Sequence, residues 1–305
     1  MTTTTAPVPA PGTAPGNEDA ALATPSLARR TLRVFTGNKL ALTGVVLLAL
    51  LLAFSYLGPL LYDTEQVHTD LSQANLSPGT DGHLLGTTDL GYDMVGRLMV
   101  AGRTSLEIGL AAGLLATLLG TVYGAVSGYF GGWVDAALMR ITDAALAIPA
   151  MFLLVVVAAI ITPSKGVLVL IIAAVAWLSP ARLVRGEALS LRDREYVQAM
   201  RMMGGGGARA VVKHIVPNAV GTVIVNCTFQ IADAILYVSY LAFLGLSIPP
   251  PSADWGSMLS AGITYTQNGY WWLIFPPGIA IVLVVAAFNF IGDGLRDAFD
   301  VRLRK

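Results

Sequence analysis

Long apolar segments divide the chain, and this pattern constrains its fold more than any other feature. The segments are residues 40–62, 104–129, 135–161, 167–183, 218–246 and 271–290. A helix rises about 1.5 Å per residue, so each segment is long enough to cross a hydrocarbon layer of about 30 Å. The sequence therefore predicts an all-α polytopic membrane protein with six transmembrane helices.

Composition supports a membrane protein and excludes several other classes. Apolar residues make up 55% of the chain and charged residues only 12%, whereas about a quarter of the residues in a soluble domain are charged. The formal net charge of zero argues against nucleic acid as a partner. The single cysteine, Cys227, lies in an apolar segment, so we interpret it as a buried side chain and expect no metal site.

The two ends of the chain indicate its domain organisation and orientation. Residues 1–28 are rich in Thr, Ala, Pro and Gly, which predicts a disordered tail without the pattern of a signal peptide. Residues 29–305 form the expected transmembrane domain. Basic residues mark the cytoplasmic side of membrane proteins, and they follow the tail and close the chain. They are Arg29, Arg30, Arg33, Lys39, Arg302, Arg304 and Lys305.

A basic stretch between the fourth and fifth segments, about residues 186–217, is predicted to lie in the cytoplasm. Its apolar residues fall mostly at intervals of three and four, which predicts a surface helix. Four glycines, residues 204–207, then interrupt that helix, because each glycine disfavours it by about 1 kcal/mol. A second short helix should follow, and Pro217 stands where a further helix can begin. The alternative is an ordinary basic loop.

This stretch resembles the EAA loop of ABC-importer permeases. The run EYVQAMRMMG at residues 195–204 and HIVPN at 214–218 are similar to EYVQAARALGA…RHILPN of the peptide-importer branch. Gln198, Ala199 and Met200 occupy the E-A-A positions, and Gly204 the glycine. Gln198, Met200 and the run of four glycines depart from the usual residues. We call residues 186–217 the coupling loop.

Three further segments extend the resemblance over about residues 30–304. LGTTDLGYD at residues 85–93 is similar to the family segment LGTDDLGRD, with Tyr92 in place of Arg. PPPSADWG at 249–256 resembles the outer loop before the sixth helix. NFIGDGLRD at 289–297 resembles the family's carboxyl-terminal segment, in which Val301 replaces the usual Pro.

The resemblance implies a type I ABC-importer permease, the C-type subunit of a heterodimer with a second permease. It also implies two cytoplasmic ATPases, an external binding protein and a bacterial plasma-membrane location with both termini inside. No G-x-x-x-x-G-K-[ST] loop occurs in the sequence, so we expect no catalytic residue or cofactor here, and ATP and Mg²⁺ in the partner ATPases. The residues expected to contact an ATPase are Glu195, Tyr196, Val197, Gln198, Ala199, Met200, Met203 and Gly204.

Polar residues within the apolar segments are candidates for the translocation path. Asn226, Gln230 and Asp233 are spaced four and three apart, so they share one face of the fifth helix. That face either lines the path or forms a hydrogen-bonded seam between helices. Asp143 lies in the third segment, and we expect it to pair with Arg140 three residues earlier.

Structural features are also expected within two of the helices. Pro149 should bend the third helix. The second segment carries glycines four residues apart, which favour close packing of helices. These are Gly109, Gly113, Gly120, Gly124 and Gly128.

Other functions remain open at this point. An ion-coupled secondary transporter would use buried carboxylates such as Asp143 and Asp233, but no internal repeat is evident. An intramembrane hydrolase is disfavoured because His68, His83 and His214 all lie outside the spans. For the two loop histidines, His68 and His83, we expect solvated, unpaired side chains. A channel fits the helix count. The family resemblance favours di- or oligopeptides as substrate, with nickel, glutathione or another small solute as alternatives.

Overall fold

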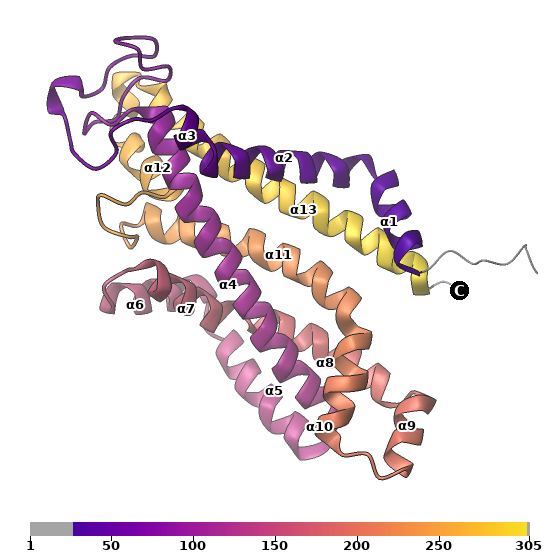
Figure 1. Ribbon diagram of the computed structural model, residues 1–305. Coiled ribbons are helices and arrows are strands. Elements are labelled where there is room, and N and C mark those ends of the chain that lie inside the picture. Colours follow the sequence, from indigo (N-terminus) through magenta and orange to yellow (C-terminus); the bar gives the residue numbers. More distant parts are fainter. Residues whose placement is uncertain (1–26, 304–305) are drawn as a thin grey trace, which may run out of the picture.

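The protein is a bundle of helices in a computed structural model that describes residues 27–303 (Figure 1). The expected N-terminal tail lies outside the described residues except for its last two positions. Within residues 27–303 the only β pairing is an isolated bridge between Thr87 and Asp93. The longer helices are α1 (Leu27–Gly37), α2 (Lys39–Tyr56), α4 (Met94–Phe130), α5 (Gly132–Leu146), α6 (Ala150–Ile160), α7 (Lys165–Ala176), α8 (Leu178–Arg192), α9 (Glu195–Met202), α11 (Val216–Phe243), α12 (Trp255–Ile263) and α13 (Phe275–Leu303).

Four continuous helices are long and apolar enough to cross a membrane. They cover Lys39–Tyr56, Met94–Phe130, Gly207–Phe243 and Trp271–Phe299. Two bent pairs, α5–α6 and α7–α8, pass the same test as pairs, which gives up to six spans when each pair counts as one. The all-α polytopic architecture predicted from the apolar segments is confirmed.

Both bent spans have a local explanation in the sequence. The axes of α5 and α6 meet at 77°, and Pro149 is the residue before α6, as the sequence predicted. The axes of α7 and α8 meet at 45° around Trp177. Pro180 lies in the first turn of α8, where its missing N–H removes no helical hydrogen bond. The fourth span therefore continues beyond residue 183, its expected end, to Arg192.

Helix α4 is the central element, and its glycines allow two neighbours to approach closely. A Cβ atom on Gly113 would lie 2.7 Å from Ile231 of α11. One on Gly120 would lie 2.7 Å from the Trp177 carbonyl, and one on Gly128 would lie 2.6 Å from the carbonyl oxygen of Arg185 in α8. Small residues four apart thus serve helix packing, as predicted.

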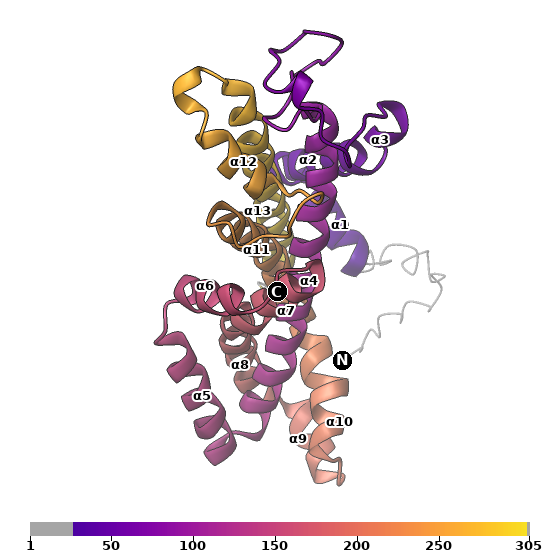
Figure 2. The ribbon, with the colours of Figure 1, turned by 90° about the vertical axis from the view of Figure 1, so that its left-hand side faces the viewer.

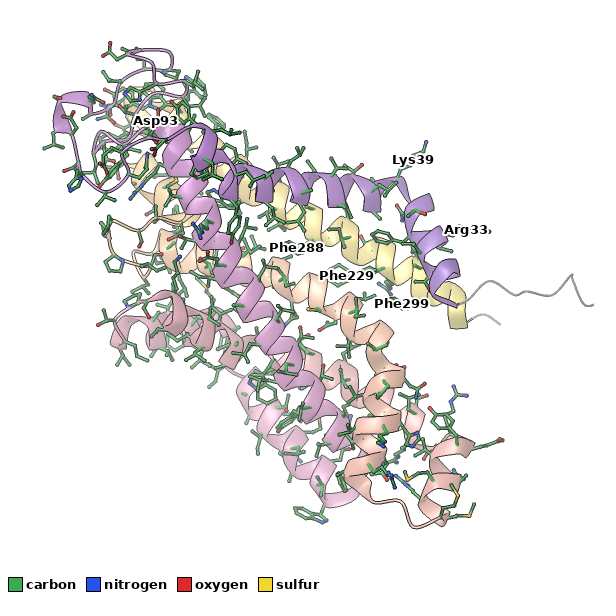
Figure 3. The ribbon with its side chains drawn as sticks, viewed as in Figure 1. Arg33, Lys39, Asp93, Phe229, Phe288 and Phe299 are labelled. Carbon is green, nitrogen blue, oxygen red and sulfur yellow. The ribbon has the colours of Figure 1, made fainter. Side chains whose placement is uncertain are left out.

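The loops and the chain ends separate to opposite ends of the molecule. The segments around residues 63–93 and 247–270 lie together at one end, while α1, α9 and the C-terminal end of α13 lie towards the other (Figures 1 and 2). Figure 3 shows Asp93 at the first of these ends and Arg33 and Lys39 at the second. Asn38 donates to Asp297 across 3.1 Å, which ties the first helices to the last.

The loop end is a folded cap built on the segment at residues 85–93. Asp93 caps α4 by accepting from the Gly96 N–H, 2.8 Å away, and also accepts from the Tyr62 hydroxyl at 2.9 Å. Trp272 donates its indole N–H to the Thr87 carbonyl across 3.2 Å. Gly91 has φ +81°, and a side chain there would collide with Asp70, so this position requires glycine.

The cap corrects the expectation that the loop histidines are unpaired. His83 Nδ1 lies 2.8 Å from the Asp93 carboxylate, and its Nε2 lies 3.1 Å from Gln73. His68 lies 3.3 Å from Glu65. Folding of the loop brings these partners together from positions up to ten residues apart, which local spacing does not reveal.

Candidate functional site: the coupling loop and an inner cavity

The coupling loop is helical over most of its length, as predicted, but it contains a break that the periodicity did not indicate. Helix α8 ends at Arg192, and α9 begins at Glu195. After α9, Gly204 adopts φ +82° and its N–H bonds to the Arg201 carbonyl at 3.0 Å. Glycine tolerates this left-handed conformation without steric cost, so the chain turns sharply at the predicted interruption.

One face of α9 packs into the core of its own chain. Val197 has an exposed fraction of 0%, and Met200 is also buried. Both belong to a cluster with Tyr129 of α4, Val184 of α8 and Ile215. This corrects the expectation that Val197 and Met200 pack against an ATPase, because both side chains are already covered by helices of this chain.

The opposite face of α9 is exposed. Met202 and Met203 have exposed fractions of 85% and 81%, and Tyr196 is also exposed. Four other expected contact residues are exposed as well: Glu195, Gln198, Ala199 and Gly204. Met202 was not among the residues selected from the sequence, although an unbranched apolar side chain next to a glycine run is a usable signal for an adaptable contact surface.

Two arginines fasten the coupling loop to the C-terminal end of α4. Arg201 of α9 donates from Nε to the Tyr129 hydroxyl at 3.1 Å, and its Cζ lies 4.5 Å from the centre of the Tyr129 ring. Arg192 donates to the Gly128 carbonyl at 3.3 Å. A displacement of α9 must therefore either move α4 or break these contacts.

Ion pairs connect α5 to α8 next to the same region. Arg185 of α8 forms a two-pronged pair with Asp135 of α5, with distances of 2.5 and 2.6 Å. Asp143 of α5 pairs with Arg182 of α8 at 2.5 Å, which corrects the expected pair with Arg140. The helical neighbour satisfied the spacing rule, but the partner comes from another helix.

The chain returns from the coupling loop into the fifth span along a continuous helical path. The short helix α10 (Gly207–Ala210) runs through a π-helical turn at Val211–Ile215 into α11, so that Gly207–Phe243 is unbroken. Within the wide turn the Val216 N–H bonds to the Val211 carbonyl. Helix α11 begins at Val216 with Pro217 in its first turn, where the sequence indicated that a helix can begin.

The polar residues of α11 do not share a single environment. Gln230 is buried and donates to the Ala176 carbonyl at 2.6 Å, where α7 ends. Asn226 borders a cavity, and Asp233 is exposed on the molecule's surface. Gln230 therefore forms a seam between helices, Asn226 is half-buried beside the cavity, and Asp233 is open to its surroundings.

The cavity has a volume of about 1020 Å³ and lies between α8, α9, α11 and α13. Phe229 of α11 and Phe299 of α13 lie between these two helices (Figure 3) and form an apolar part of its wall. Its opposite wall carries polar and charged residues from the end of α8 and the start of α9. Those residues are Glu187, Ser190, Asp193, Arg194, Glu195 and Tyr196.

In the N-terminal half of α4, Glu107 is part of a charged cluster. Lys165, the first residue of α7, donates to one carboxylate oxygen of Glu107 at 2.7 Å, and Arg103 donates to the other at 3.2 Å. Tyr56 of α2 donates to Glu107 at 3.4 Å. The cluster joins α2, α4 and α7.

Comparisons with known proteins agree with this architecture. A model of the family described as binding-protein-dependent transport system inner membrane component matches residues 84–305. A model of the N-terminal transmembrane domain of oligopeptide transport permease C matches residues 26–78.

Several curated proteins are similar along most of the chain. The oligopeptide transport system permease protein OppC of Bacillus subtilis is 38% identical over 273 residues, which cover 89% of this chain and 88% of that protein. OppC of Escherichia coli K12 is 39% identical, covering 89% and 90%. The dipeptide transport system permease protein DppC of Bacillus subtilis is 37% identical, covering 88% and 83%.

Proposed function

Because the chain belongs to the family of binding-protein-dependent transport system inner membrane components, we propose that it is the permease subunit of an ATP-driven importer of di- and oligopeptides. Identity of 37–39% to oligopeptide and dipeptide permeases along nearly the whole chain supports the peptide substrate. The observation that carries the proposal is that α9 has two different faces. One face of α9 is fixed to the spanning helices and the other presents Tyr196, Met202 and Met203.

The proposed orientation has the coupling loop and both termini in the cytoplasm of a bacterium, with the chain in the plasma membrane. The end of α13 lies beside α1, and both these elements and α9 lie away from the cap, which supports this arrangement (Figure 1). The excess of Arg and Lys in the coupling loop supports the cytoplasmic assignment of that end. The opposite cap is rich in acidic residues and faces outward in this arrangement.

The partners follow from the same proposal. A second permease completes the heterodimer, two cytoplasmic ATPases bind ATP and Mg²⁺, and an external binding protein delivers the peptide. The exposed face of α9, with Glu195, Gln198 and Met203 among its residues, contacts an ATPase. Methionine suits this role because its unbranched, polarisable side chain adapts to an irregular groove. In this division of labour the chain itself is not an enzyme.

The contacts of α9 supply a route for transmitting ATPase movement. When the ATPases close, α9 moves, and the Arg201–Tyr129 contact and the buried Val197 and Met200 carry the inner ends of α4 and α8 with it. The ion pair between Arg185 and Asp135 makes α5 follow. The bends at Pro149 and Trp177 separate α6 and α7 from this block, so these two helices are less directly attached to α9. In this mechanism α5, α8, α9 and the adjoining end of α4 move together as one block relative to the opposite ends of the spans, which gives alternating access.

We further propose that Asn226 and Asp233 border the translocation path. Both lie on α11, three or four residues on either side of Gln230; Asp233 is exposed, and Asn226 is half-buried at the border of the cavity. An exposed carboxylate in a membrane-spanning helix is costly in lipid, which supports a position of Asp233 against water or the second permease. Gln230 belongs to the helix seam instead.

The proposal is tested with the complete transporter, purified and reconstituted in vesicles. We expect uptake of labelled di- and oligopeptides that requires ATP and the binding protein and continues when ion gradients are collapsed. Uptake that persists without ATP but stops with an ion gradient would favour a secondary transporter. Uptake of nickel or glutathione, with no peptide transport, would overturn the peptide assignment and retain the importer.

A further inference from the structure

The cavity beside α9 has walls on two parts of the structure that are otherwise joined only indirectly. One wall is formed by α8 and α9, and the other includes Arg296 and Phe299 near the end of α13. Among residues 31–299, whose side chains the structure describes, no hydrogen bond or ion pair links α13 to α8 or α9. A ligand filling the cavity would connect the two walls directly.

Charged groups of both signs line this cavity and lack ion-pair partners. Glu187, Arg194 and Glu195 on the wall formed by α8 and α9, and Arg296 on the wall formed by α13, make no salt bridge to any described side chain. Nearby charges outside the cavity are paired, as in Arg185 with Asp135 and Arg182 with Asp143. Unpaired charges of opposite sign on facing walls match a ligand that carries both an ammonium and a carboxylate group.

The remaining lining suits the body of such a ligand. Asn226 lines the cavity and adds a polar amide group to its wall. Phe229 and Phe299 offer apolar surface for side chains. A volume near 1020 Å³ is at the upper end of the range for small-ligand sites, which span about 300–1,000 Å³.

We propose that this cavity is a cytoplasm-facing binding site for a free short peptide with charged termini. We infer that an occupied site holds α9 relative to α13 and slows the transport cycle. The inference rests on the proposed function, because it takes the imported peptide as ligand and α9 as the moving element. A ligand shifts a conformational equilibrium only when it prefers one state, and this cavity exists only while α8, α9 and α13 keep their present spacing.

Occupancy is measured directly by protection of a cysteine in the cavity wall. Cys227→Ala removes the native thiol, Ser190→Cys introduces one in the lining, and the other subunits of the reconstituted transporter are made cysteine-free. Trialanine added on the ATPase side should slow maleimide labelling. N-acetyl-trialanine amide, which lacks both charges, should protect at least tenfold less well.

A second experiment measures the effect of the peptide on function. The rate of ATP hydrolysis is measured while binding protein and substrate are supplied on the side of the membrane opposite the ATPases. Trialanine on the ATPase side should lower the rate. Arg296→Gln and Glu187→Gln should each require about tenfold more trialanine for the same inhibition, the loss expected for one charged hydrogen bond. The matched controls Arg33→Gln and Asp293→Asn alter exposed charges outside the cavity and should respond like the parent protein.

The outcomes separate this inference from the proposed function. A transporter that shows no ATP-driven peptide uptake contradicts the proposed function. A transporter that imports peptide normally, but shows no protection of Ser190→Cys and no inhibition by trialanine, overturns only the inference. Equal protection by the blocked peptide would also overturn it, because recognition by charged groups is the basis of the site. A cysteine that cannot be labelled at all would mean that another subunit fills the cavity.

Discussion

Arg201 of α9 lies over the ring of Tyr129 of α4, with 4.5 Å from its Cζ atom to the ring centre, and donates from Nε to the hydroxyl of the same residue at 3.1 Å. A cation–π contact and a hydrogen bond thus act on one pair of residues from two different helices. Each contact contributes on the order of 1 kcal/mol. The pair fixes α9 to the inner end of the central helix.

Loss of this pair should uncouple ATP hydrolysis from transport. We expect Arg201→Ala to lower peptide uptake per ATP hydrolysed severalfold, because α9 then moves without carrying α4. Tyr129→Phe keeps the ring and should have a smaller effect. Uptake and ATP hydrolysis are measured together in vesicles. Arg209→Ala, which changes an exposed arginine of α10, is the matched control, and an equal loss there would contradict the assigned role.

Aspartate substitutions on the two faces of α9 should give opposite defects. Met203 is exposed, so Met203→Asp should leave thermal stability nearly unchanged while preventing recovery of the ATPase with the permease. Met200 is buried, so Met200→Asp places an unpaired charge in the core at a cost on the order of 3 kcal/mol. Thermal unfolding and co-purification distinguish them. Normal ATPase binding by Met203→Asp would exclude this face as the contact.

A methyl group at Gly128 should separate α4 from α8. Its Cβ would lie 2.6 Å from the Arg185 carbonyl, so the backbones must move apart. We expect Gly128→Ala to destabilise the protein by about 1–3 kcal/mol, as overpacking does elsewhere. Gly166→Ala is the control, because a Cβ there meets no atom within 4 Å. Unfolding temperatures of the two variants in detergent test the difference, and equal values would contradict the packing argument.

Asp254 should make the outer cap less stable as pH rises. Burial raises the pKa of this carboxyl above its ordinary value, although hydrogen bonds from Ser247 and Ser257 act in the opposite direction. The folded state therefore binds more protons than the unfolded state. Stability is highest below the ordinary pKa of 3.8, falls as pH rises from there to the folded-state pKa, and is level above it.

The matched variant Asp254→Asn should remove this dependence while keeping the cap of α12. An amide oxygen can still accept from the Ser257 N–H, which lies 2.9 Å from Oδ1 of Asp254. Unfolding temperatures of both proteins are compared from pH 4 to neutral pH. A parallel pH profile for the two would show that Asp254 does not titrate between the folded and unfolded states in the expected way.

The spans, their bends and the close helix contacts can be predicted from short stretches of sequence, because each depends on the residues of a single segment. Length and apolarity determine which segments can cross a bilayer, and Pro149 bends its helix wherever that helix lies. Four-residue glycine spacing places close contacts on one face of α4. These features do not depend on which helix packs beside which.

Side-chain partners depended on tertiary neighbours and were harder to predict. Asp143 had a helical neighbour at suitable spacing in Arg140 but pairs with Arg182 of another helix. His83 finds Asp93 only after the outer loop folds. Periodicity correctly indicated an apolar face on α9, but Val197 turns towards its own chain because α4 and α8 supply a core there. Whether such a face meets its own chain or another protein is not encoded in spacing.

The π-helical turn at Val211–Ile215 keeps the chain from Gly207 to Phe243 in one helix despite Pro217. At 1.5 Å per residue this helical path is roughly 55 Å long, and it bends between its α10 end and the rest of α11 (Figure 1). Because its hydrogen bonding is not interrupted by a flexible loop, a displacement of the coupling loop passes directly into the fifth span and along it towards the far surface.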